Sequence, residues 1–294
     1  FENEGWFDPG LLLRALHTKC SSLGVNFVVG EVLDFEPFNL PMTMRQLDMP
    51  ERPAMTLKPM RTAVVSLSDG PNKKIKFANV VNAAGPWAAD LARMVEIGSS
   101  EHFSVPLPVE PRLQRIYVVR PKRGAVRKSS DTPSPLPEPG LDTPFIIDYN
   151  GLHVQRRDLS GEFIVYSNNE LTDLTKFTDD PLEMDVDYAV FHEKLGKQLA
   201  NRIPSLASVD IVCAWTGVCD YNPVDGNWIV GSHSCHWNMY LCNGSSGHGA
   251  QHAIAVGRAI FELLVFGHFK TIDLTRFSFD RFYLNHQTVK ESNT

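Results

Sequence analysis

The chain has 294 residues, of which 43% are hydrophobic and 21% are charged, a balance typical of a folded globular protein rather than a disordered one. Its 28 basic and 34 acidic residues give a formal net charge of −6 and are spread along the sequence, which argues against a nucleic-acid-binding protein. The five cysteines form no CxxC pair, so the pattern predicts neither a zinc site nor a secreted disulfide framework.

The longest apolar stretch, residues 253–266, contains Arg258 and Glu262 and falls short of a membrane span, so we expect no transmembrane segment. The sequence begins at Phe1 with neither an initiator methionine nor a targeting signal, which predicts a processed or truncated product. Neither feature indicates a cellular compartment.

The first predicted element is a helix that begins at Asp8-Pro9 and ends at Gly24. Aspartate caps free N–H groups, proline fits the first helical position, and glycine ends a helix. Residues 25–32 are mostly apolar and predict a short strand. The chain therefore starts with a helix and a strand, which is half of an α/β layer.

A loop and a hairpin are expected next. Residues 37–62 hold five prolines and five methionines without a period, which predicts a loop or insertion. Two short segments with strand-like patterns, residues 62–67 and 74–77, flank the turn sequence Asp69-Gly70. This arrangement predicts a β-hairpin.

Residues 79–87 read Asn-Val-Val-Asn-Ala-Ala-Gly-Pro-Trp. They predict a buried strand, a glycine turn at Gly85 and a helix that runs to about Val95. A strand that enters a turn of small residues and then a helix is how an α/β sheet presents backbone N–H groups to a nucleotide.

From about Pro106 the pattern changes to that of a mixed sheet-and-helix module. Residues 121–140 are rich in proline, serine and charge, which predicts a surface loop. A helix is expected from Tyr188 through Leu199, ended by Pro204. Strands are expected at residues 116–119, 145–148, 152–155 and 163–166, with a tight turn at Asn150-Gly151.

The α/β pattern then returns, with short strands at residues 211–215, 228–231 and 239–243. The last strand leads into Gly244-Ser-Ser-Gly-His-Gly249 and an apolar helix that runs to Phe266. Three glycines and two serines before a helix leave backbone N–H groups uncovered at the positive end of the helix dipole. Such a loop suits negative charge, including the charge that develops on a reduced flavin; a plain strand-to-helix turn is the alternative.

Two of these segments resemble a known superfamily. The loop Gly244–Gly249 resembles the flavin loop of the sarcosine oxidase, glycine oxidase and D-amino-acid oxidase superfamily. Val80-Val-Asn-Ala-Ala-Gly-Pro-Trp87 is similar to that superfamily's segment near the FAD, residues 215–231 fit the stretch before the flavin loop, and residues 5–9 fit its helix start. The resemblance implies FAD as the cofactor.

The fold class that this resemblance implies is α/β, with a partial Rossmann-like FAD-binding domain and an inserted mixed-sheet substrate domain. The FAD-binding domain is expected at residues 1–105 and 211–268, the substrate-type domain at 106–210, and a C-terminal tail at 269–294. The superfamily's GxGxxG turn, which holds the pyrophosphate, occurs nowhere in the chain. We therefore expect weak or absent FAD binding by this chain alone, and FAD binding by the full-length protein.

The resemblance also implies individual site residues. Tyr221 matches an active-site tyrosine, and Cys219 matches the position of a flavin-linking cysteine; a packed phenol and a small buried thiol are the respective alternatives. The cofactor contacts that it implies are Val32, Ala83, Ala84, Gly85, Trp87, Cys219, Asp220, Ser246, Gly247, His248, Gly249 and Gln251.

Some positions depart from the superfamily pattern. Gln251 stands where sarcosine oxidases have a lysine, and Ile164 and Asn168 stand where their oxygen-activating lysine and active-site histidine fall. The resemblance therefore points away from oxygen as the electron acceptor. Arg112 and Arg115 stay open, since they suit either a substrate carboxylate or the surface. The i, i+4 pair His248 and His252 lacks further ligands nearby in the sequence, so we expect no metal.

A closer resemblance, which includes residues 108–112, 220–222 and 269–274, is to a mitochondrial member of the superfamily implicated in assembly of respiratory complex I. It implies complex I subunits or assembly intermediates as partners, and the mitochondrial matrix as the location, with association with the inner membrane left open. The alternatives are an active dehydrogenase or oxidase of a small amine or N-methyl amino acid, and a binding module that keeps the fold without useful flavin.

Overall fold

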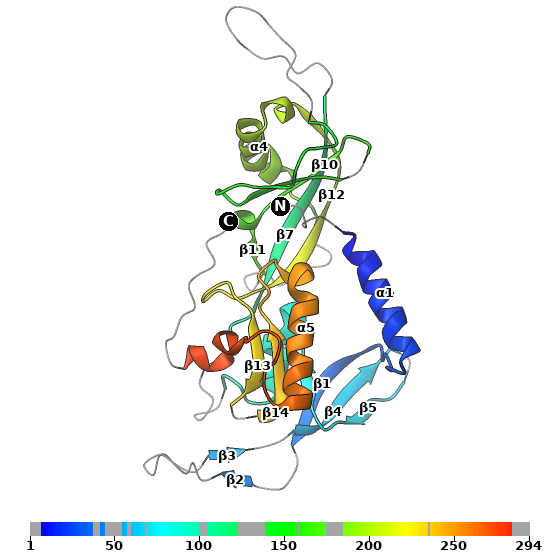
Figure 1. Ribbon diagram of the computed structural model, residues 1–294, viewed down its shortest axis with the longest axis vertical. Coiled ribbons are helices and arrows are strands. Elements are labelled where there is room, and N and C mark those ends of the chain that lie inside the picture. Colours follow the sequence, from blue (N-terminus) through cyan, green and yellow to red (C-terminus); the bar gives the residue numbers. More distant parts are fainter. Residues whose placement is uncertain are drawn as a thin grey trace, which may run out of the picture.

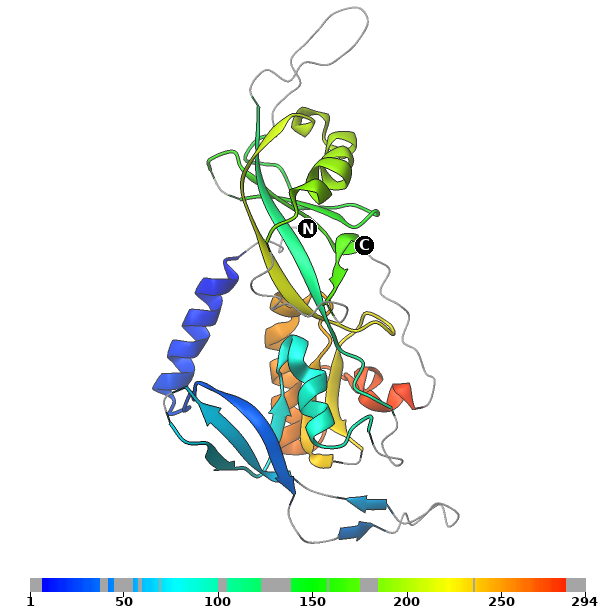
Figure 2. The same cartoon turned by 180° about the vertical axis from the view of Figure 1, so that it is seen from behind.

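The computed structural model describes residues 7–37, 42–44, 55–57, 60–68, 70–99, 105–122, 139–157, 159–174, 185–234 and 236–283. The molecule is elongated, and two long paired strands, β7 (Glu110–Pro121) and β12 (Val209–Tyr221), run from one lobe toward the other (Figures 1 and 2). Among the described residues, one lobe holds a six-stranded antiparallel sheet, and the other holds two three-stranded sheets, a two-stranded one and helix α5 (Gly249–Phe266).

The six-stranded sheet is built around β7. Strand β12 pairs along the full length of one edge of β7, and β10 (Phe163–Ser167) and β11 (Thr172–Asp173) pair with the other edge. Strands β9 (Leu152–Arg156) and β8 (Ile146–Ile147) extend the sheet beyond β10. One face of this sheet packs against the helical segment α3 (Tyr188–Val190), η4 (Phe191–Leu195) and α4 (Gly196–Arg202) through a cluster that includes Tyr117, Val154, Val165 and Leu199.

In the other lobe, two strands that the sequence predicts separately form a parallel pair. Strand β14 (His236–Asn243) runs parallel to β6 (Val80–Asn82) and antiparallel to β13 (Ile229–His233). Strand β6 continues into η1 (Gly85–Trp87) and α2 (Ala88–Met94), and β14 continues into the loop Gly244–Gly249, at whose last residue α5 begins. Beside them lie a second sheet, of β1 (Gly30–Pro37), β4 (Met60–Leu67) and β5 (Lys73–Lys76), and the hairpin of β2 (Met42–Met44) and β3 (Met55–Leu57).

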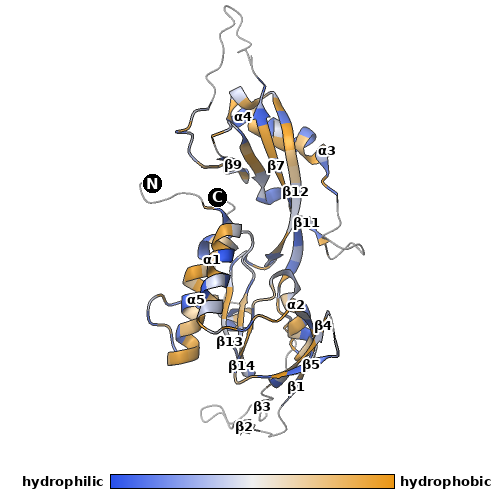
Figure 3. Cartoon of the chain, turned by 90° about the vertical axis from the view of Figure 1, so that its right-hand side faces the viewer, coloured by the Kyte–Doolittle hydropathy of each residue, from blue (hydrophilic) through white to orange (hydrophobic). Residues whose placement is uncertain are grey.

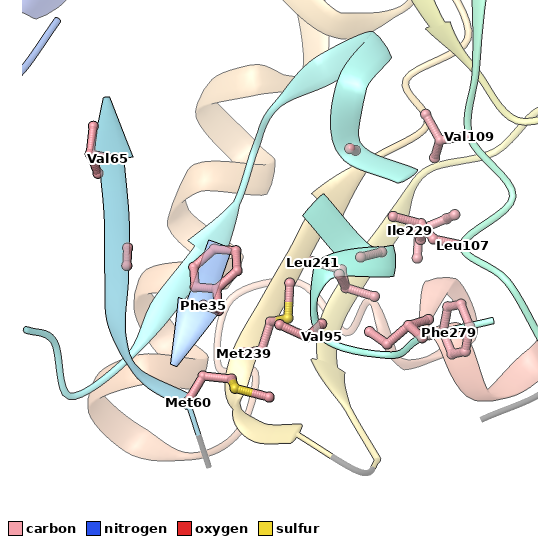
Figure 4. Packing of buried hydrophobic residues seen from close by; sticks show 14 residues of the cluster. Phe35, Met60, Val65, Val95, Leu107, Val109, Ile229, Met239, Leu241 and Phe279 are labelled. Carbon is pink, nitrogen blue, oxygen red and sulfur yellow. The ribbon is translucent and has the colours of Figure 1, made fainter. Parts of the chain in front are cut away.

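One core joins these elements (Figure 4). Phe35 of β1 and Met60 of β4 lie in the same cluster as Met239 and Leu241 of β14. Phe279, from the C-terminal segment, lies in this cluster as well and is 1% exposed. The described part of the C-terminal segment around Phe279 therefore packs into the core of this lobe.

The N-terminal helix is confirmed. Helix α1 spans Pro9–Ser22, and the Asp8 carboxylate accepts a hydrogen bond from the backbone N–H of Leu11 at 2.9 Å. Gly24 has φ of +89°, in the left-handed region that glycine favours after a helix. Helix α1 has no buried residue, and Figure 2 shows it standing apart from the rest of the chain.

Two expectations about the N-terminal third are wrong. The strand expected at residues 25–32 begins at Gly30 instead and runs to Pro37, because its ladder is set by pairing with β4 and residues 25–29 lie outside that ladder. The loop expected at residues 37–62 contains the paired strands β2 and β3 and the first residues of β4. Asp69 and Trp6 lie outside the described residues.

Helix α5 is, among the described residues, the one helix long and apolar enough to cross a membrane by length and composition alone. By length and composition alone, α5 therefore does not fit the expectation of a chain without a transmembrane segment. Figure 3 shows apolar residues along this helix. Its contacts with β13 and β14, and the buried carboxylate of Glu262, favour a helix that covers a sheet.

Glu262 holds the chain that follows α5. Its carboxylate accepts hydrogen bonds from Arg258 Nε at 2.8 Å and from the backbone N–H groups of Lys270 and Thr271 at 2.7 and 3.0 Å. The Thr271 hydroxyl donates to it as well. These bonds, with that of Thr271 first, lower the pKa of Glu262 to about 2.

The hydrogen bonds that the Glu262 carboxylate accepts from Lys270 and Thr271 should be lost in acid. Because the folded pKa of Glu262 lies below the ordinary value of about 4.3, its contribution is complete above that value and is lost as pH falls toward 2. We expect amide hydrogen exchange at Lys270 and Thr271, corrected for the intrinsic rate, to speed up between pH 5 and pH 3. A Glu262→Gln variant should show faster exchange already at pH 5 and little further change; a wild-type protein with constant protection over this range would contradict the prediction.

Candidate functional site

The two predicted loops lie at one edge of the sheet. Strands β6 and β14 are parallel, with Asn82 opposite Leu241, so the segments that follow their carboxyl ends emerge on the same side. Residues 83–87 follow β6, and Gly244–Gly249 follow β14. The turn η1 also contacts β7 and β12. The structure therefore brings Gly85, the first residue of η1, close to the long strands, with Ala83 and Ala84 directly before it in the chain.

The loop Gly244–Gly249 has an unusual backbone. Gly244, Ser246 and Gly247 have φ values of +70°, +52° and +97°, and a positive φ in a serine is uncommon and is found often at functional sites. Helix α5 begins directly after it, and no side chain caps its first turn. The first backbone N–H groups of a helix have no partner within the helix, so they remain available to an anionic group.

The loop is fixed to the end of β12. The Asp220 carboxylate accepts hydrogen bonds from the Ser245 backbone N–H at 3.0 Å and from the Ser245 hydroxyl. The Ser246 N–H donates to the Asp220 carbonyl at 2.9 Å, and the Asn222 N–H donates to the Ser246 hydroxyl oxygen at 3.0 Å. Asp220 therefore holds the loop in its strained form from outside, and it leaves the helix N-terminus free.

These residues fit a flavin edge. Asn243, the last residue of β14, is fully buried, and within the described part of the chain neither of its amide atoms has a hydrogen-bond partner. Orphaned polar atoms of this kind are rare in folded interiors and are explained where a ligand or water completes the bonding. The Asn243 Nδ2 group and the backbone N–H groups at the uncapped start of α5 are donors that suit the polar edge of a flavin ring, and Asn243 Oδ1 is an acceptor.

One face of the six-stranded sheet looks toward this loop. In an antiparallel ladder, residues directly opposite each other share a face, so Arg112 lies beside Cys219 and Tyr166 lies beside His153. The opposite face packs against α4. We define the loop-side face of the sheet as the residues Arg112, Gln114, Ile116, His153, Ile164, Tyr166, Trp215 and Cys219.

Asn168 connects this face to the loop. Gln114 Nε2 donates a hydrogen bond to Asn168 Oδ1 at 3.0 Å. A Cβ atom placed on Gly247 would lie 3.8 Å from the same Asn168 oxygen. Asn168, the first residue of η2 (Asn168–Glu170), therefore lies against the loop, and Ile164 lies on the preceding strand β10, opposite Val118. Neither position carries a positive charge.

The two arginines left open by the sequence lie on opposite faces. Arg112 lies on the loop-side face, where its guanidinium bonds Glu110 at 2.6 Å, lies 3.9 Å from Asp173 and stacks over the Tyr221 ring at 5.1 Å. Arg115 lies on the other face and donates to Thr172 at 2.8 Å. Two carboxylates already offset the charge of Arg112, so the geometry does not favour it as a clamp for a substrate carboxylate.

Cys219 is a poor nucleophile in this environment. Burial raises the pKa of its thiol to about 12, and the neighbouring Asp220 carboxylate acts in the same direction. The thiolate is the reactive form of cysteine, so this environment favours a packed thiol over a covalent link to the flavin.

We therefore predict that the full-length protein holds its flavin without a covalent bond. Precipitation with acid should release all of the yellow colour into the supernatant, and a Cys219→Ser variant should bind the same amount of flavin as the wild type. Colour that stays in the wild-type pellet and disappears from the pellet of the variant would contradict this prediction.

The polar side chains at the start of α5 are paired with one another. Gln251 Nε2 lies 2.9 Å from His248 Nδ1, and Trp228 Nε1 donates to His252 Nδ1 at 3.1 Å. His252 also lines an apolar cavity of about 210 Å³ beside Trp228 and Phe277. Within the described residues no group of three or more histidine, cysteine, aspartate or glutamate side chains is placed to hold a metal.

Of two further predicted contacts, one lies in another sheet and the other is exposed on η1. Val32 lies on β1 opposite Val65, in a separate sheet, and packs against the core of that lobe. Trp87 is 48% exposed at the end of η1. The structure does not bring Val32 to the loops, so its role as a contact of the cofactor stays a prediction.

The sequence interpretation missed His153 and Tyr166. They lie directly opposite each other on β9 and β10, and their rings stack with centroids 4.5 Å apart. His248 of the loop lies close enough to His153 to lower its pKa. The only signal in the sequence was the alternation of β9, which does not say which of its faces meets the loop.

Comparison with known proteins decides the family. A family model described as FAD dependent oxidoreductase matches residues 1–263. The chain belongs to the FAD-dependent oxidoreductase family. It is 36% identical over 289 residues to FAD-dependent oxidoreductase domain-containing protein 1 of Xenopus laevis, and 34% identical over 290 residues to that of Bos taurus. These alignments cover 96% and 97% of this chain but 53% and 55% of the relatives, so the chain spans about half the length of the curated relatives it matches.

Solved structures support the fold of this family member. L-proline dehydrogenase from P. horikoshii matches with a TM-score of 0.69 at 20% identity, over 96% of this chain and 61% of that one. Glycine oxidase from Geobacillus kaustophilus matches with a TM-score of 0.59 at 21% identity, over 91% of this chain and 56% of that one. These matches confirm the α/β fold class with its mixed and antiparallel sheets, and the family implies FAD as the cofactor.

Proposed function

We propose that the whole protein binds FAD with the flavin ring between the loop Gly244–Gly249 and the loop-side face, and that it oxidises the C–N bond of a small amine or amino acid. The observation that carries this proposal is the uncapped start of α5, fixed by Asp220 beside Tyr221. When bound, FAD accepts the hydride equivalent from the carbon next to the amine nitrogen.

The residues of this chain contribute binding and electrostatics. Backbone N–H groups at the start of α5 stabilise negative charge at the polar edge of the ring. Tyr221 offers a phenol to the substrate, and the sheet excludes water from one side of the site. Because Gln251, Ile164 and Asn168 offer no fixed positive charge, the acceptor of the electrons is a carrier rather than oxygen.

Flavin absorbance tests this function directly. The full-length protein, purified with its flavin, is mixed without oxygen with sarcosine, dimethylglycine and the common amino acids in turn. Bleaching of the flavin band by any of them supports the proposal and identifies the substrate class. A flavin band that no substrate changes would overturn the enzymatic role, and a protein without flavin would overturn the cofactor.

We expect tight FAD binding to need the part of the full-length protein that corresponds to the half of the relatives outside these alignments. The chain contains no GxGxxG turn, and in the described residues β6 forms the open edge of its sheet. Apolar side chains such as Leu13 of α1, at 68% exposed, and Ile254 and Val265 of α5 are available to pack against further chain. Residues 1–294 alone should therefore retain far less FAD than the full-length protein, which fluorescence of the released flavin measures.

A second candidate role is assembly of respiratory complex I in the mitochondrial matrix. It is supported by the resemblance of residues 269–274 to the member of the superfamily that is implicated in this assembly. In mitochondria lacking the protein we expect less assembled complex I, and re-expression should restore it. Restoration by a variant that keeps its flavin but is not bleached by amines would assign the assembly role to the folded flavoprotein rather than to its catalysis.

A further inference from the structure

His153 is a buried polar side chain without a complete set of partners. It is 5% exposed, and within the described part of the chain its Nδ1 has no hydrogen-bond partner. Its ring stacks on Tyr166 at 4.5 Å with an angle of 12° and contacts Phe145 at 5.8 Å. Aromatic contacts fix the ring in place, and none of them satisfies its nitrogen. Folded proteins rarely leave such an atom unpaired without a functional reason.

The position of His153 places its unpaired Nδ1 on the side of the sheet that faces the proposed site. It lies on the loop-side face, next to Tyr166 of β10 and Ile147 of β8. Burial, and to a smaller extent His248 of the flavin loop, lower the pKa of His153 to about 4. The imidazole is therefore neutral near pH 7, with one nitrogen that donates and one that accepts a hydrogen bond.

We propose that His153 is a substrate-contacting residue that recognises the amine nitrogen by accepting a hydrogen bond from its N–H group. This proposal rests on the proposed function, since it names the group that binds the amine. Tyr166 is the positioning residue that holds the ring by stacking. A group this weakly basic does not remove a proton from an ammonium ion, so its role is recognition of the substrate and not acid–base catalysis.

An amine that cannot react tests binding apart from catalysis. The probe 2-aminoisobutyrate has an amine and a carboxylate but no hydrogen on its α-carbon, so it cannot lose a hydride equivalent there. Trimethylacetate has the same shape and carboxylate, with a methyl group in place of the amine. Both are titrated into the full-length protein with its flavin, and the change in flavin absorbance gives a dissociation constant for each.

The variants separate the hydrogen bond from the packing. In His153→Phe, which keeps an aromatic ring, we expect 2-aminoisobutyrate to bind roughly tenfold more weakly and trimethylacetate to bind as before. His153→Gln keeps an acceptor and should bind the amine within about threefold of the wild type. His192→Phe, on the exposed side of η4, is the control and should change neither constant. Flavin content and the unfolding temperature check the fold of each variant.

The other results overturn the proposal. Equal weakening of both probes in His153→Phe would assign His153 to the carboxylate or to the fold, and no weakening would remove it from the site. A wild type that binds neither probe also overturns it. Failure of the proposed function gives another result: no oxidisable amine bleaches the flavin, but His153→Phe still weakens the binding of 2-aminoisobutyrate and not that of trimethylacetate.

Discussion

Replacing Arg281 with methionine is expected to lower the free energy of unfolding by about 3–5 kcal/mol, the usual result of removing one partner of a buried ion pair. Arg281 Nε and Nη2 donate to the two carboxylate oxygens of Asp225 at 2.8 and 3.1 Å. The two side chains are only 3% and 1% exposed. The substitution leaves the Asp225 charge buried without its cationic partner, although the hydrogen bonds from Asn222 and Asn227 remain.

Urea denaturation of the wild type and the variant measures this difference. Arg93→Met is the matched control, because Arg93 forms an exposed pair with Asp90 and exposed pairs contribute about 0–1 kcal/mol. Adding Asp225→Asn to Arg281→Met removes the uncompensated charge and should recover part of the loss. If Arg281→Met costs no more than Arg93→Met, the ion pair does not hold the C-terminal segment on this lobe.

Local patterns in the sequence predict the units that surround the site. The cap at Asp8, the turn at Gly85 and the loop Gly244–Gly249 each depend on a few consecutive residues, and each is found where the pattern places it. Caps and glycine turns are determined by nearby backbone groups, so a single sequence is enough to find them. The strand expected at residues 25–32 fails because a ladder depends on its distant partner, here β4.

The contacts that complete the site join residues far apart in the sequence. Asp220 bonds Ser245, which is 25 positions away, and Arg281 bonds Asp225, which is 56 positions away. No periodicity encodes such pairs. The register of β7 and β12 also decides that Arg112, and not Arg115, lies on the loop-side face. A shift of one residue would exchange the two arginines, which is why the sequence left both open.

Substituting Asp220 with alanine is expected to weaken FAD binding by the full-length protein by about 10- to 100-fold, the equivalent of one or two hydrogen bonds to a charged group. The carboxylate bonds both the N–H and the hydroxyl of Ser245, and these bonds hold Ser246 in its positive-φ conformation. Without them the loop relaxes, and the donors at the start of α5 lose their fixed positions. Flavin fluorescence during titration of the apoprotein measures the dissociation constant.

Asp210→Ala provides the control on the same strand. Asp210 lies at the other end of β12, is 67% exposed and pairs with Lys122 on the surface, so its loss should leave FAD binding unchanged. Asp220→Asn keeps one acceptor oxygen and should give an intermediate loss. Wild-type affinity in Asp220→Ala would mean that the loop keeps its shape by other contacts. Equal losses in Asp220→Ala and Asp210→Ala would indicate general destabilisation of β12. Asp220 is identified as the residue that fixes the flavin loop only if FAD affinity falls from Asp210→Ala through Asp220→Asn to Asp220→Ala.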